Sequence, residues 1–132
     1  LTEYTNQSKI NFKNFELNMI EASEQSERLS IPALDKIIKL NDLVANFPSN
    51  RGLVFCDEGN GNLPTIYNAL INKTEKYKKW AVIIGPEGGF SEKERSSITS
   101  LSSCISVSLG RRILRSDTAT TAAIFSIQSV IE

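Results

Sequence analysis

A strand-to-helix turn at residues 80–94 sets the tightest limits on the fold of this chain. The apolar run 80–84 ends in a Gly-Pro-Glu-Gly-Gly segment at 85–89, and Ser91 with Glu94 forms a capping-box pattern that predicts a helix start. Glycine permits positive φ and close approach of a ligand, whereas proline fixes φ and removes a donor. Open α/β folds place ligands at such strand ends, so the turn predicts a binding loop. A tight turn without a ligand stays an alternative.

The same order of strand, loop and helix returns at residues 104–131. An apolar strand is predicted for 104–109, an arginine-rich loop follows, and a helix of small and apolar residues is predicted for 117–131. Asp117 would stand near the N-terminus of this helix, where an acidic side chain is favourable. The two loops are one strand–helix–strand unit apart, so they would lie at the same edge of a parallel sheet and could form one pocket.

Strands and helices alternate along the rest of the chain as well. The apolar residues of the helix predicted at 12–29 are expected to pack in a core. The further predicted elements are a strand at 31–38, a helix at 41–47, a strand at 52–57, a helix at 63–72 and a central strand at 80–84. This alternation predicts an α/β fold, a parallel sheet with helices on both faces.

Composition excludes several classes of protein. The 132 residues carry 15 basic and 15 acidic side chains, so the chain is not one whose whole surface binds nucleic acid. Cys56 and Cys104 lie on separate predicted strands and the chain has no histidine, which predicts reduced thiols, no metal site and a cytoplasmic location. No apolar run is long enough to span a membrane. The loop at 58–62 lacks the Lys-Ser/Thr of a P-loop.

Three segments together resemble a known family. Residues 84–91, Ile-Gly-Pro-Glu-Gly-Gly-Phe-Ser, and 109–119, Leu-Gly-Arg-Arg-Ile-Leu-Arg-Ser-Asp-Thr-Ala, are similar to the C-terminal domain of RsmE-type ribosomal RNA methyltransferases of the SPOUT superfamily. Residues 21–32 resemble the family's Glu-Gln-x-x-Arg element followed by a proline. The chain departs from the family at Ser116-Asp117, where Thr-Glu is more usual. The matches are in order and extend along most of the chain.

The resemblance implies a fold and a function. It implies a SPOUT-type sheet with a C-terminal trefoil knot, a homodimer, and methyl transfer from S-adenosylmethionine to N3 of a uridine in small-subunit ribosomal RNA. Residues 1–132 would form one methyltransferase domain. Its first strand and helix, and the family's N-terminal PUA-like RNA-binding domain, are expected to be absent, so the chain is expected to be a fragment.

The resemblance also implies which residues form the site. The implied cofactor-binding residues are Ile84, Gly85, Pro86, Glu87, Gly88, Gly89, Leu109, Gly110, Ile113, Leu114 and Arg115. The implied catalytic residues are Arg115, Arg28 and Gln25, and the implied RNA-binding residues are Arg111, Arg112 and Arg28. Arginine is not a base at neutral pH, so these arginines would stabilise the uracil anion or clamp phosphates. Glu87 and Asp117 could accept a proton, but a structural role for Glu87 within its own loop is favoured.

Two other classes of function stay open. A non-catalytic cofactor-binding or RNA-assembly module would keep the same loops. A Rossmann-type NAD enzyme would need Gly-x-Gly-x-x-Gly after an early strand, and Gly59-Asn60-Gly61 supplies only half of that fingerprint.

Overall fold

The computed structural model describes residues 1–4, 10–58 and 62–131 of the chain. It divides into two compact units. The sheet unit consists of Leu1–Thr5 with Lys39–Glu132, and the N-terminal helical unit consists of Asn6–Ile38. The half fingerprint at 59–61 lies outside the described residues.

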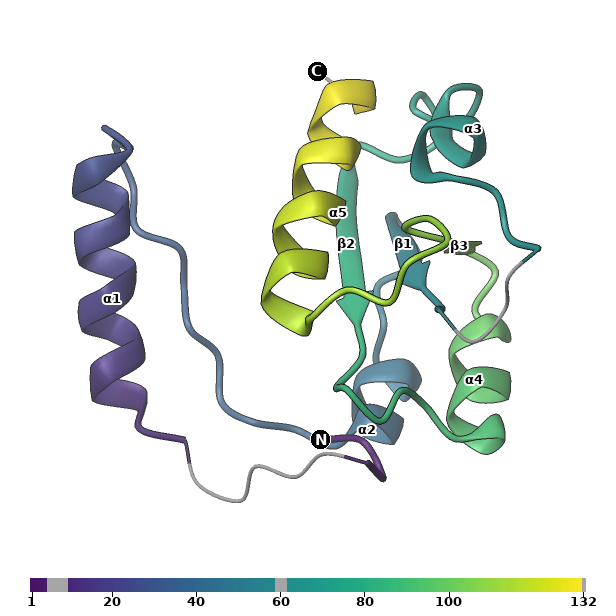
Figure 1. The fold of residues 1–132 in the computed structure, drawn as a ribbon, viewed down its shortest axis with the longest axis horizontal. Helices are drawn as coiled ribbons and strands as arrows, with labels where there is room; N and C mark the ends of the chain where they lie inside the picture. The colour runs from purple at the N-terminus through teal and green to yellow at the C-terminus, as the bar shows by residue number, and fades with distance from the viewer. Residues whose placement is uncertain (5–9, 59–61, 132) are drawn as a thin grey trace. The chain divides into compact units, whose positions relative to one another are not determined.

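Within its described residues, the sheet unit contains three parallel strands: β1 (Arg51–Cys56), β2 (Lys79–Ile84) and β3 (Cys104–Val107). Their order is β2-β1-β3 (Figure 1). Phe55 of β1 pairs with Ile83 on one side and Ser106 on the other. The prediction that 80–84 would be the central strand is therefore wrong. The middle position belongs to β1 because its apolar residues are fully buried on both faces of the sheet.

Helices cover both faces of this sheet, as the sequence predicts. Helices α3 (Ile66–Leu70) and α5 (Ser116–Ile131) lie on one face, and α2 (Leu40–Ala45) and α4 (Glu92–Thr99) lie on the other. Alternate residues of β1 supply the two cores. Val54 packs in the same cluster as Ala123 of α5, and Leu53 in the same cluster as Ile98 of α4. Leu109 of the first cluster and Phe90 of the second belong to the strand-to-helix loops at the carboxyl edge of the sheet.

The N-terminal helical unit differs from its prediction in two ways. Helix α1 (Phe12–Gln25) is capped by the Asn11 side chain and ends four residues early, because Glu27 adopts a positive φ of 55°. The apolar face expected in a core is exposed, with Phe15 50% accessible. The strand predicted at 31–38 is wrong: this segment has no regular structure, and Pro32 has no amide hydrogen to donate to a neighbouring strand.

Candidate functional site

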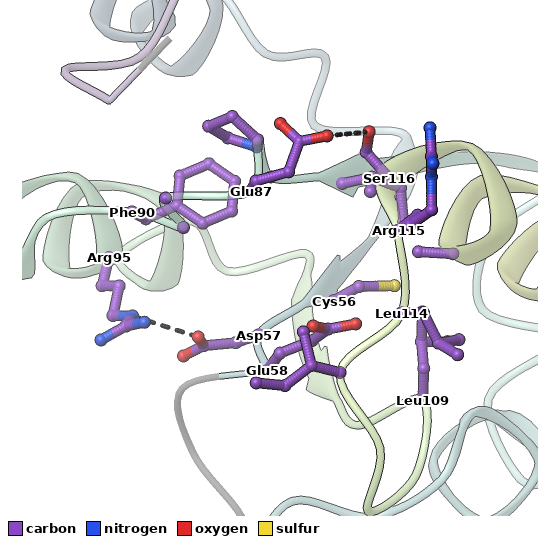
Figure 2. Close-up of a pocket in the computed structure, with 17 residues that line it drawn as sticks. Cys56, Asp57, Glu58, Glu87, Phe90, Arg95, Leu109, Leu114, Arg115 and Ser116 are labelled. Carbon is purple, nitrogen blue, oxygen red and sulfur yellow. Dashed lines mark hydrogen bonds and ion pairs between the residues drawn. The ribbon is translucent and has the colours of Figure 1, made fainter. Parts of the chain in front are cut away.

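A cavity of about 390 Å³ lies at the carboxyl edge of the sheet (Figure 2). Its volume falls within the range of small-molecule sites, roughly 300–1,000 Å³. The lining residues all belong to the sheet unit, and they are Cys56, Asp57, Glu58, Ile84, Gly85, Pro86, Glu87, Gly88, Gly89, Phe90, Arg95, Leu109, Ile113, Leu114, Arg115, Ser116 and Ala119. The structure thus brings together every predicted cofactor-binding residue except Gly110.

The first loop of the cavity, residues 85–89, is a compact turn built on its glycines. The amide of Gly89 donates to the carbonyl of Pro86 at 2.8 Å, and Gly89 has a φ of +69°. A Cβ atom at Gly85 would lie 2.7 Å from the ring of Phe90, so the backbone and this ring are in close contact. The predicted capping box follows: Ser91 and Glu94 bond reciprocally at the start of α4. This geometry explains the glycines at 85 and 89.

The second loop supplies apolar and basic residues. Leu109 and Leu114 line the cavity, whereas Ile113 is 89% exposed and provides little wall. The side chain of Arg115 is 85% exposed and stands 3.6 Å from Asp117. Gly110 has a φ of +117° and turns the backbone without lining the cavity.

Arg111 and Arg112 are exposed and lie outside the cavity lining. The arginine-rich segment therefore places one guanidinium at the cavity and two on the adjoining surface.

A side-chain hydrogen bond joins the two loops. The hydroxyl of Ser116, the first residue of α5, donates to Glu87 Oε1 at 3.1 Å (Figure 2). Glu87 thus connects the first loop to the second, instead of capping donors in its own loop as expected. Asp117 accepts from the amide of Thr118, and this bond lowers the pKa of the exposed Asp117 carboxyl.

The end of β1 contributes residues that the sequence analysis missed. Asp57 is buried and forms an ion pair with Arg95 of α4 at 3.1 Å, and Arg95 also contacts Glu92 at 3.2 Å. Burial and, second, the charge of Glu58 raise the pKa of the Cys56 thiol to about 12, so Cys56 is a neutral thiol. Two acidic residues directly after a buried strand were the signal available. The missed lining residues are Cys56, Asp57, Glu58, Phe90, Arg95, Ser116 and Ala119.

Gln25 and Arg28 belong to the N-terminal helical unit and are not among the lining residues. Gln25 donates to Glu21 at 3.2 Å, and Arg28 donates to the carbonyl of Ser30 at 3.3 Å. Their predicted catalytic roles stay predictions.

The described residues contain no group of acidic, cysteine or histidine side chains arranged to hold a metal ion. Among them, no helix has both the length and the apolar character required to cross a bilayer.

Known proteins are similar to this chain in sequence and fold. Residues 1–128 match the family model described as an RNA methyltransferase domain. A Ribosomal RNA small subunit methyltransferase E of Rickettsia conorii is 30% identical over 97% of this chain, which covers 51% of that relative. A Legionella pneumophila structure described as a methyltransferase with the bound cofactor SAM superposes with a TM-score of 0.79, at 27% identity, over 98% of this chain and 52% of that one.

A second solved structure gives the same result. The Ribosomal RNA small subunit methyltransferase E of Neisseria gonorrhoeae, bound to S-adenosyl methionine, superposes with a TM-score of 0.74 at 26% identity. The match covers 94% of this chain and 52% of that one. The chain thus spans about half the length of these proteins.

Proposed function

We propose, because this chain belongs to the family of RNA methyltransferase domains, that it binds S-adenosylmethionine in the cavity at the sheet edge and methylates N3 of a uridine in small-subunit ribosomal RNA. The observation that carries the proposal is the convergence of two loops, 85–89 and 109–115, on one cavity. Relatives that are crystallised with this cofactor, and relatives named as small-subunit methyltransferases, support the cofactor and the substrate respectively.

The loops fit the cofactor chemically. Turns rich in glycine expose backbone donors and acceptors, which suit an adenine edge, and Leu109 and Leu114 supply apolar contact for its faces. The loop residues named in the sequence analysis, Gly110 included, are proposed to hold it. The bound cofactor would supply a methyl group on a cationic sulfonium. The chain therefore has to position the uracil and favour loss of its N3 proton.

Arg115 is the proposed catalytic residue, because its guanidinium is exposed at the cavity and can stabilise negative charge on the uracil ring. Arg28 and Gln25 are proposed to assist from the N-terminal helical unit. Arg111 and Arg112 are proposed to contact RNA phosphates next to the cavity, and Arg28 is proposed to join them there.

The quaternary structure, topology and location are proposed from the same resemblance. The chain is proposed to form a homodimer, to carry a trefoil knot at its C-terminal end and to act in the cytoplasm. On α5, Ile124 and Phe125 are 44% and 72% exposed, which is consistent with a helix that packs against a second subunit.

Calorimetry followed by a transfer assay tests the function. We expect S-adenosylmethionine and S-adenosylhomocysteine to bind with micromolar affinity and NAD to give no heat. Labelled methyl should then pass to unmethylated small ribosomal subunits, with Arg115→Ala reducing transfer more than cofactor binding. Cofactor binding without transfer would favour the non-catalytic module, and NAD binding would refute the cofactor assignment.

A further inference from the structure

The cavity carries more negative than positive charge. Its lining contains the carboxylates of Asp57, Glu58 and Glu87 against the guanidinium groups of Arg95 and Arg115. Three carboxylates and two guanidinium groups leave a surplus of one negative charge in the lining at neutral pH. This is unexpected for a site that works on a polyanion, because a negative cavity repels phosphate.

Two of the three carboxylates in the lining, those of Glu58 and Glu87, have no ion-pair partner among the described residues. The charge of Asp57 is balanced by Arg95 at 3.1 Å, whereas Glu87 accepts a hydrogen bond from the neutral hydroxyl of Ser116, which leaves its negative charge in place. Of the two residues without an ion-pair partner, Glu58 is the one that directly follows the end of β1 and Asp57, and it is exposed. Figure 2 shows it extending from the end of β1 beside Cys56, and its charge contributes, after burial, to the raised pKa of that buried thiol. Glu58 therefore adds a negative charge to the cavity lining at the end of β1.

We propose that Glu58 is a specificity-determining residue that makes the cavity prefer the cationic sulfonium form of the cofactor over the neutral thioether product. The inference rests on the proposed function. S-adenosylmethionine has one more positive charge than S-adenosylhomocysteine, and otherwise the two differ by one methyl group. Both ligands carry the same ammonium and carboxylate groups, so a carboxylate in the lining distinguishes them only through its attraction for the sulfonium, which the product lacks. Loss of the charge on methyl transfer would then weaken binding and assist product release.

The test measures the ratio of the two dissociation constants in matched variants of the chain. Calorimetry with both ligands is performed on the wild type, on Glu58→Gln, which removes the charge, and on Glu58→Asp, which retains it. Glu75→Gln makes the same charge change at an exposed position outside the cavity lining. The aminated analogue of the cofactor, whose protonated nitrogen replaces the sulfonium, separates the effect of charge from that of the methyl group.

We expect Glu58→Gln to weaken S-adenosylmethionine and the aminated analogue about fivefold, or roughly 1 kcal/mol, and to change S-adenosylhomocysteine less than about twofold. Glu58→Asp should recover most of the preference, and Glu75→Gln should leave it unchanged.

Equal weakening of both ligands in Glu58→Gln would overturn the inference, as would an unchanged ratio. Either result would leave the cofactor site itself standing, because the wild type still binds. A folded wild type that binds neither ligand would overturn the proposed function, and the inference with it.

Discussion

Gly85→Ala should destabilise the chain through one identified contact. Gly85 has no positive φ, so an alanine costs little in the backbone itself. Its Cβ, however, would lie 2.7 Å from Cε2 of Phe90 and 3.2 Å from two further ring atoms. The ring cannot easily withdraw, because Phe90 is 6% exposed and packs edge-to-face on Phe55 at 5.1 Å. Overpacking of this kind costs roughly 1–3 kcal/mol, and we expect about 2 kcal/mol.

A double-mutant cycle measured by urea unfolding isolates this contact. Phe90→Leu removes ring atoms and should cost about 1–2 kcal/mol alone through lost packing with Phe55. In the double variant the alanine gains room, so the two losses should sum to at least about 1 kcal/mol more than the measured total. Gly110→Ala is the control: nothing lies within 4 Å of its Cβ, and its penalty comes from a φ of +117°, so it should not couple to Phe90→Leu. Additive losses for Gly85→Ala would refute the close-contact argument.

Four further predictions test the site and its supports. Gly89→Val places a β-branched residue at φ +69°, with strain of about 1–2 kcal/mol; it should abolish cofactor heat in calorimetry but leave the far-UV spectrum unchanged. Because the pKa of Cys56 is raised from 9.0 to about 12, folding stability should fall as pH rises through that window, by at most ~1.4 kcal/mol per unit; Cys56→Ala should flatten this slope in urea melts. The backbone amides of Glu3 and Ser91 donate to the Glu94 carboxylate at 2.8 and 3.0 Å, and Glu94→Ala removes this acceptor. The free energy of unfolding should fall by about 2–3 kcal/mol, and an unchanged urea midpoint would contradict this. Charge reversal at positions 111 and 112 should weaken RNA binding and its salt dependence without affecting cofactor affinity, as filter binding can show.

Local chemistry made much of the sheet unit predictable. The capping box of Ser91 and Glu94 marks the start of α4, and the apolar run before Gly85 marks β2. These signals depend on nearest neighbours in the sequence, so they hold whatever the tertiary arrangement. The prediction that the two loops share one cavity also succeeded, because the carboxyl ends of parallel strands meet at one edge.

Long-range pairing was less predictable. The segment 31–38 has the apolar composition of a strand, but a strand needs a partner, and no sequence pattern shows whether one is available. The same applies to Phe12 and Phe15, whose helical spacing predicts a buried face without showing what covers it. Composition reports the tendency to be buried, whereas pairing and packing are decided by the rest of the fold.

The order of the strands places the end of β1 between the two predicted loops, and the sequence alone did not show this order. From β1 the chain passes through α3 on one face to β2, and from β2 through α4 on the opposite face to β3. Neighbouring strands β1 and β2 therefore send their loops to opposite faces, which opens a crevice at their carboxyl ends. Asp57 and Glu58 face the 85–89 loop across this crevice. The proposal that both loops hold the cofactor therefore places it beside the end of β1, where Asp57 and Glu58 line the cavity.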